Sequence, residues 1–302
     1  MFTRKKPTEY QQAKTLLQRQ SLLLRGGLPS AKIWSTLAGE GHRVAQRLEM
    51  AAAKTNTSVE DALTALQHPV WRLYAAVLTV AKTSGAPLAL ACERLAGALQ
   101  ELETIRQKRG VLLAGPKIST TIICSLPIFA IGIGYLMGFD PVRVLTTGFG
   151  VLLAAAGLTL LTIGALWIRV LIKRVEQAEI IAGIECELLI IALGGGKPIS
   201  EAVRLVVDSL DKTETAWCDL KQFTREGEVT KALNTAVLVG TPVSQMLLET
   251  AHSQRQEVQA KLAKQAEKLG VKVLLPMSCC VLPAFMLLGV VPVLMSIIGE
   301  MF

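Results

Sequence analysis

Three long stretches of the chain carry no charged side chain, and they dominate its hydrophobic pattern. They cover residues 118–138, 144–168 and 273–299. Each is at least as long as the roughly 20 residues that a helix needs to cross about 30 Å of hydrocarbon. Because a membrane helix satisfies its own backbone hydrogen bonds, the pattern predicts three transmembrane helices.

Two charged segments, 1–117 and 169–272, show the three- and four-residue spacing of amphipathic helices. Each contains two glycine-x-proline tripeptides. Glycine suits the left-handed position that ends a helix, and proline suits the first turn of the next, so the tripeptides predict helix-turn-helix connections. Their residues are Gly27 and Pro29, Gly85 and Pro87, Gly196 and Pro198, and Gly240 and Pro242. The predicted fold class is an all-α integral membrane protein with two cytoplasmic antiparallel helical bundles and three transmembrane helices.

Composition and charge placement add a location and an orientation. Of the 302 residues, 51% are hydrophobic, which is typical of a membrane protein. Lys and Arg lie beside the spans on both charged segments, and no apolar run near the N-terminus is long enough for a signal peptide. We therefore expect a multi-pass protein of the cell membrane with a cytoplasmic N-terminus, an external turn at 139–143 and an external C-terminal tail at 300–302.

The net charge of +8 does not indicate a nucleic-acid partner. Residues 1–117 carry 17 basic and 8 acidic residues, whereas residues 169–272 carry 14 of each, and only 5% of the chain is aromatic. Stacking platforms for bases are therefore scarce. Topology and anionic lipid headgroups explain the basic residues beside the spans, so membrane lipids are expected partners and nucleic acid is not.

Sites for chemistry are lacking. The six cysteines show no C-x-x-C spacing and are typical of small buried hydrophobic residues, and no H-E-x-x-H motif occurs. The stretch GGGKPIS at 194–200 lacks the first glycine, the final hydroxyl and the preceding strand of a phosphate loop. We expect no catalytic residue, no cofactor, no metal and no enzyme activity.

Two features inside the spans are candidates for packing and bending. Small residues of the second span fall on one face and predict a close-packing seam for another helix. Prolines of the third span each remove a backbone hydrogen bond, so they predict either a hinge or a static groove. The seam residues are Gly150, Ala154, Gly157 and Gly164, and the prolines are Pro276, Pro283 and Pro292.

Three stretches resemble a known family. They are WRLYAAVLTVAKTSGAPLALACERLAGAL at 71–99, LLAGPKIST followed by GFDP, and LLPMSCCVLPAFMLLGVVPVL. They are similar to the type II secretion system F family of inner-membrane platform proteins, and more narrowly to its short actinobacterial members associated with tight-adherence (Tad/Flp-type) pili. The resemblance covers about 71–175 and 240–298, whereas 1–70 and 207–239 match only in their helical character.

This resemblance implies a platform that sits under a growing fibre, holds pilin subunits and receives mechanical work from a hexameric cytoplasmic ATPase. A second platform subunit, or another copy of the chain, is a further implied partner. Because the chain has no nucleotide loop, the energy would come from the ATPase. The alternative is a channel or transporter subunit, which the absence of Asp, Glu, Lys, Arg and His from the spans disfavours.

The basic helix before the first span is the predicted docking edge for the ATPase. Its candidate residues are Arg94, Arg106, Lys108 and Arg109. Electrostatic complementarity mainly sets encounter rate and partner choice, and the two charged segments differ in net charge. Attraction to lipid headgroups is the competing explanation, above all for the two residues nearest the span.

Overall fold

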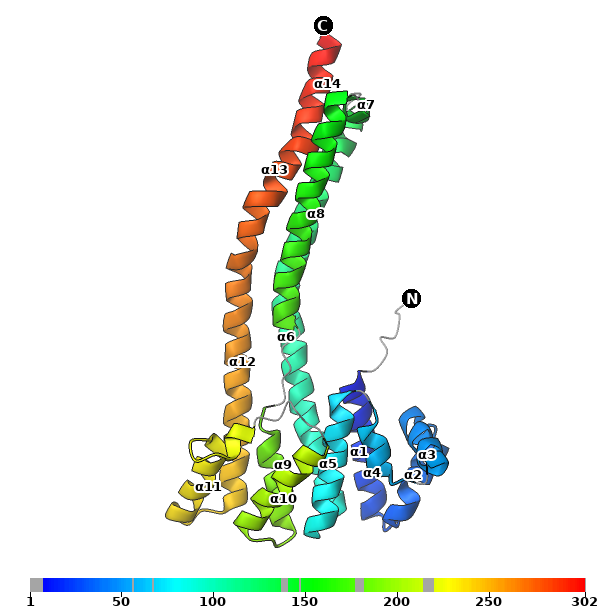
Figure 1. The fold of residues 1–302 in the computed structure, drawn as a ribbon, viewed down its shortest axis with the longest axis vertical. Coiled ribbons are helices and arrows are strands. Elements are labelled where there is room, and N and C mark those ends of the chain that lie inside the picture. The colour runs from blue at the N-terminus through cyan, green and yellow to red at the C-terminus, as the bar shows by residue number, and fades with distance from the viewer. Residues whose placement is uncertain are drawn as a thin grey trace. The chain divides into compact units, whose positions relative to one another are not determined.

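The computed structural model describes residues 8–55, 57–66, 68–136, 141–146, 148–176, 182–213 and 220–301 (Figure 1). These residues are predominantly helical and contain no strand, which confirms the all-α expectation. They divide into two compact units. We call the described parts of 1–106 and 179–258 the helical unit, and the described parts of 107–178 and 259–302 the membrane unit.

The helical unit consists mainly of short helices. Helix α1 begins with a capping box, in which Thr8 Oγ1 accepts from the Gln11 N–H and the Gln11 side chain accepts from the Thr8 N–H. This helix covers Glu9–Arg25. The elements that follow it in this unit are α2 (Ser30–Gly39), α3 (Arg43–Thr55), α4 (Val59–Thr64), α5 (Pro69–Ser84), α9 (Ile184–Gly194), α10 (Ile199–Lys212), a 3₁₀ turn (Leu220–Phe223) and α11 (Glu228–Val239). The first parts of α6 (Leu88–Leu136) and α12 (Val243–Pro276) complete it.

The two charged segments share this one unit, whereas the sequence suggests a separate bundle for each. Helix α5 packs against both α9 and α10. Ser209 Oγ of α10 also donates to the Ala76 carbonyl of α5 at 3.3 Å. The physical reason lies in α5 and α9, which are buried along most of their length. A helix that is apolar all round needs cover on several sides, and here one segment covers the other.

The glycine-x-proline tripeptides form the connections between helices. All four glycines have positive φ, from 74° at Gly240 to 84° at Gly27, and Gly85 and Gly240 end α5 and α11 in the left-handed conformation. The prolines stand directly before the first helical residue, one position earlier than the first turn suggested by the sequence. Pro29 and Pro198 are the N-caps of α2 and α10, where a missing N–H costs nothing. Pro87 and Pro242 directly precede α6 and α12 in the same way.

The membrane unit contains the long apolar helices. Among the described residues, three helices are long and apolar enough to cross a membrane, and they lie in Leu88–Leu136, Gly148–Glu176 and Val243–Ile298. Its further elements are α7 (Pro141–Thr146), α8 (Gly148–Glu176), a π-helical segment (Met277–Val281), α13 (Leu282–Phe285), a second π-helical segment (Met286–Val290) and α14 (Val291–Met301). Residues 139 and 140 of the expected external turn lie outside the described residues, as do the last two residues of the first predicted span, and α7 begins within the remaining part of the turn.

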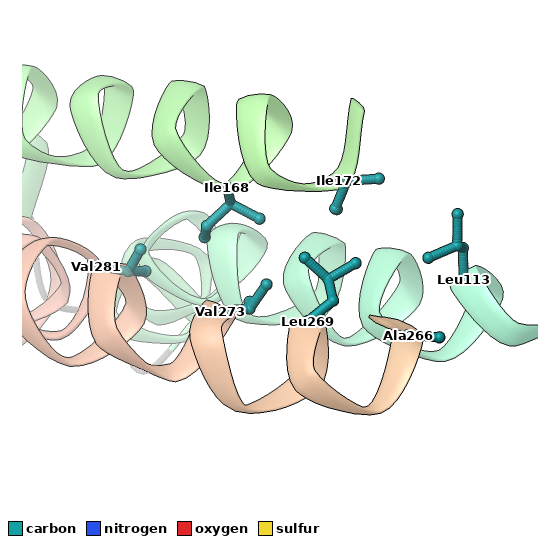
Figure 2. Close-up of a cluster of buried hydrophobic side chains, with 7 residues drawn as sticks. All are labelled: Leu113, Ile168, Ile172, Ala266, Leu269, Val273 and Val281. Atoms are coloured by element: carbon teal, nitrogen blue, oxygen red, sulfur yellow. The ribbon is translucent and has the colours of Figure 1, made fainter. Parts of the chain in front are cut away.

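An apolar cluster joins the three long helices of the membrane unit. Figure 2 shows its seven buried side chains, which come from α6, α8, α12 and the first π segment: Leu113, Ile168, Ile172, Ala266, Leu269, Val273 and Val281. Since α6 and α12 each begin in the helical unit and continue past this cluster, their charged and apolar parts belong to single helices.

Candidate functional site

The predicted seam on α8 is built of glycines that leave no room for a side chain. Gly150, Gly157 and Gly164 are buried at intervals of seven residues, and Ala154 is half-buried between them. A Cβ on Gly157 would lie 2.5 Å from Leu288 Cγ, and one on Gly164 would lie 2.9 Å from Cys280 Cβ. The seam therefore faces the last span at two levels.

The third seam glycine serves a different contact. A Cβ on Gly150 would lie 1.8 Å from the carbonyl oxygen of Val144 in α7. Gly150 therefore lets the start of α8 lie directly against the backbone of α7. Of the four predicted seam residues, Gly157 and Gly164 are the two whose missing side chains bring α8 against the last span.

Two prolines of the last span each follow a π-helical segment. The Leu282 N–H donates to the Met277 carbonyl, and the Val291 N–H donates to the Met286 carbonyl, both across five residues. Pro283 and Pro292 come directly after these two donors. A proline ring clashes with the carbonyl four residues earlier, and widening the preceding turn relieves that clash. The last span thus stays helical through both prolines.

The glycine seam and the π segments meet. Gly164 lies against Cys280 and Val281 of the first π segment, and Gly157 lies against the second. On its other side the second π segment approaches α6, since a Cβ on Gly289 would lie 3.0 Å from Ala130 Cβ. The structure brings together two features that the sequence predicts separately. Pro276, the third proline, ends α12, and its carbonyl oxygen lies 3.8 Å from the Cβ position of Gly164.

A nine-residue repeat in the last span is the signal that could have predicted both π segments. The stretch MSCCVLP at 277–283 is followed by MLLGVVP at 286–292. Methionine, valine and proline recur at the same places in each stretch. The prolines alone indicate weak points in the helix, whereas their spacing together with Met and Val marks two equivalent turns.

A buried ion-pair network in the helical unit was not predicted. Arg255 of α12 is 2% exposed, and its guanidinium donates to Glu101 Oε2 of α6 at 2.7 Å and to Glu187 Oε1 of α9 at 3.1 Å. Its Nε also donates to the Ala182 carbonyl at 3.3 Å. The network joins three helices that are far apart in sequence. Its signal was the presence of Glu185 and Glu187 in the otherwise apolar stretch IECELLIIAL.

Two of the four candidate docking residues make contacts inside the helical unit. Arg94 Nη1 lies 3.8 Å from Glu187 Oε2, and the Arg106 guanidinium lies 3.6 Å from the centre of the Tyr10 ring. Both contacts are inside the helical unit. Lys108, which donates to Gln259 Oε1 at 3.0 Å, and Arg109 belong to the membrane unit. Arg94 and Arg106 thus contribute to internal packing, and reversing their charge would disturb the unit itself.

The described cysteines outside the spans are both buried. Burial raises the pKa of the Cys92 and Cys186 thiols to about 12, so both stay protonated at neutral pH. In the spans, Cys280 is buried but Cys279 is exposed, and Cys218 lies outside the described residues. Within the described part of the chain, no group of three or more His, Cys, Asp or Glu side chains could hold a metal ion.

Comparison with known proteins gives one family. Residues 186–291 match the family described as type II secretion system (T2SS), protein F. The match runs from α9 to the start of α14, so it includes Glu187 and Arg255 of the buried network and both π segments. It supports the T2SS F family resemblance. No curated protein and no solved structure matches the chain.

Proposed function

We propose that the chain is an inner-membrane platform protein of a Tad-type pilus or a related type II secretion machine. In this role it holds pilin subunits and couples them to a cytoplasmic ATPase, and it is not itself an enzyme. The observation that carries the proposal is the family match over 186–291, which includes most of the second charged segment and most of the last span.

The composition and packing of the spans support a scaffold. The stretches 118–138, 144–168 and 273–299 contain no Asp, Glu, Lys, Arg or His. Transport across a membrane relies on polar groups near its centre. In place of such groups, the seam glycines of α8 contact the last span directly. Close helix packing of this kind suits a rigid body that other subunits bind.

Force from the ATPase would travel along α6 and α12. Both helices begin in the helical unit and continue without interruption into the membrane unit. Within the helical unit, Arg255 connects α12 to Glu101 of α6 and to Glu187 of α9. A displacement of the helical unit would therefore move both helices together. The π segments are where the last span could bend in response.

The proposed orientation places the helical unit in the cytoplasm and the C-terminus outside. Lys and Arg flank the spans on the side of the helical unit, which favours this orientation. A cysteine introduced at Glu300 should react with an impermeant thiol reagent added to intact cells, whereas a cysteine at Thr8 should not. Labelling only at Thr8 would reverse the orientation.

Reconstitution distinguishes a platform from a channel. The full-length protein is placed in lipid vesicles, and two quantities are measured: the hydrolysis rate of the secretion ATPase of the same organism, and the leak of a trapped small solute. A platform should raise ATPase activity and leave the solute trapped. Solute flux without the ATPase would support the channel alternative instead.

A further inference from the structure

A groove between α6 and α8 in the membrane unit has a volume of about 690 Å³, within the range of small-molecule sites. Its walls run from Lys117 to Ile128 on α6 and from Ala165 to Glu176 on α8, which is eleven residue-to-residue steps on each helix. At 1.5 Å per residue this is roughly 16 Å, about half the thickness of the hydrocarbon layer. The groove therefore has the length of one leaflet.

Two cations in this groove lack a partner. Arg169 and Lys173 are exposed, lie four residues apart on one face of α8, and have neither a hydrogen-bond nor an ion-pair partner in the part of the chain that the structure describes. Lys117 differs, because its Nζ pairs with Glu176 Oε1 at 3.0 Å. A cation beside apolar residues at the membrane is costly unless an anion approaches it.

The neutral polar groups of the groove are already satisfied. The hydroxyls of Thr120, Thr121 and Ser125 donate to carbonyls of their own helix, at 2.7, 2.9 and 2.7 Å. Arg169 and Lys173 are thus the strongest donors left for a ligand. The end of the groove that lies away from Lys117 and Glu176 is apolar and is lined by Ile128 and Ala165. The ligand that fits is negatively charged at one end and apolar at the other.

We infer that this groove binds an anionic phospholipid of the cytoplasmic leaflet. The phosphate lies between Arg169 and Lys173, and the upper part of an acyl chain lies along Ile128 and Ala165. Lys117 directly precedes the first predicted span and Arg169 directly follows the second, so the cations are at headgroup depth. A pilin transmembrane helix would need a groove about 30 Å long and does not require two free cations.

Native mass spectrometry of the full-length protein tests the site. The protein is extracted from vesicles of phosphatidylglycerol and phosphatidylcholine, and bound lipids are counted. The double variant Arg169→Gln and Lys173→Gln should bind phosphatidylglycerol about thirtyfold more weakly. This factor comes from a loss of about fivefold in affinity for each cation removed, multiplied over the two cations. The matched control is Arg174→Gln with Lys272→Gln, which removes two exposed charges of the same membrane unit that do not line the groove.

A second variant tests the apolar end without changing charge. Ala165→Phe should reduce phosphatidylglycerol retention severalfold by filling the place of the acyl chain, while thermal unfolding of the protein changes little. Equal retention in the groove variant and its charge-matched control would overturn the inference. Displacement of the lipid by millimolar inorganic phosphate would also contradict it, because the site would then bind the anion alone. Crosslinking of a cysteine at Ser125 to a pilin rather than to a photoreactive lipid would assign the groove to a protein partner.

Discussion

The helical unit and the membrane unit reach close packing by different means. In the helical unit, large side chains such as Tyr74, Leu16 and Leu95 are fully buried, and the charged Arg255 is buried as well, paired with the buried Glu187. In the membrane unit, α8 contacts the last span at two positions where it has no side chain, Gly157 and Gly164. The contact between α8 and the last span thus differs from the core of the helical unit in what lies between the helices.

This difference in packing follows from the surroundings of the helices, which are water in one case and lipid tails in the other. Water drives large apolar side chains together, and their burial can compensate for an ion pair inside the unit. Lipid tails are as apolar as leucine, so helices in a membrane gain little from burying leucine and more from close backbone approach. Tight packing is therefore reached with glycines where α8 meets the last span among lipid tails, and with large apolar side chains in the helical unit, where water is excluded.

The largest expected loss of stability comes from a substitution in the helical unit. Arg255→Met leaves Glu187 buried without its main partner, and breaking a buried ion pair in this way costs about 3–5 kcal/mol. Thermal unfolding in detergent should show a drop of several degrees or more. Arg204→Met, which removes an exposed cation of α10, is the control and should change little.

A double substitution sharpens this result. Glu187→Leu added to Arg255→Met removes both buried charges, so the double variant should be more stable than Arg255→Met alone. If instead the two losses simply add, the ion pair does not account for the stability of the unit.

The next largest loss of stability is expected from a substitution in the membrane unit. Gly157→Leu forces a side chain into the space of Leu288 and should destabilise the packing of α8 on the last span by about 1–3 kcal/mol. Gly132→Leu is the control, because the Cβ position of Gly132 in α6 faces open space. Thermal unfolding of both variants in the same detergent measures the difference, and equal effects would show that the seam is not needed.

A smaller effect is expected at the first π segment. Pro283→Ala restores an N–H and removes the ring that the widened turn accommodates, at a cost below about 1 kcal/mol. Membrane insertion should be unchanged, while the yield of assembled fibres should fall severalfold if the segment bends during assembly. Unchanged fibre yield would indicate that the prolines only shape a static groove against Gly164.

The smallest effect belongs to an exposed ion pair of the helical unit. Arg19 donates to Glu40 at 2.6 and 2.9 Å, and this hydrogen bonding lowers the pKa of the Glu40 carboxyl below its usual 4.5. A lowered carboxyl pKa stabilises the fold above the unfolded pKa, and that contribution is lost as pH falls through the lowered value.

The stability advantage of the natural protein over Arg19→Gln should therefore be present at neutral pH and vanish in strong acid. Thermal unfolding of both proteins between about pH 7 and about pH 3 measures it. Because the pair is solvent-exposed, the difference should be small and should shrink further at high salt. An advantage that grows on acidification would contradict the assigned direction of the pKa shift.

Local patterns of the sequence predicted much of the membrane unit. Uncharged length predicted the three long apolar helices, and the placing of small residues on one face of the second span pointed to Gly157 and Gly164. Both signals lie within one helix, where spacing alone decides which face a residue occupies. The π segments were missed because a proline indicates an interrupted hydrogen bond but not how the helix accommodates it.

Contacts between distant segments could not be predicted in this way. The ion pair between Arg255 and Glu187 joins two helices whose packing depends on the whole unit. The same holds for the packing of α5 against α9, which places both charged segments in one unit. Amphipathic spacing predicts which face of a helix is covered but does not say which helix covers it.

The most direct test of the platform role is the amount of fibre on the cell surface when the chain is removed. A strain that lacks the chain, but keeps its secretion ATPase and pilins, is compared by electron microscopy with the same strain carrying the natural chain or Gly157→Leu. The platform account predicts no fibres without the chain, full recovery with the natural chain and reduced recovery with Gly157→Leu. Normal fibre numbers in the strain without the chain would contradict it.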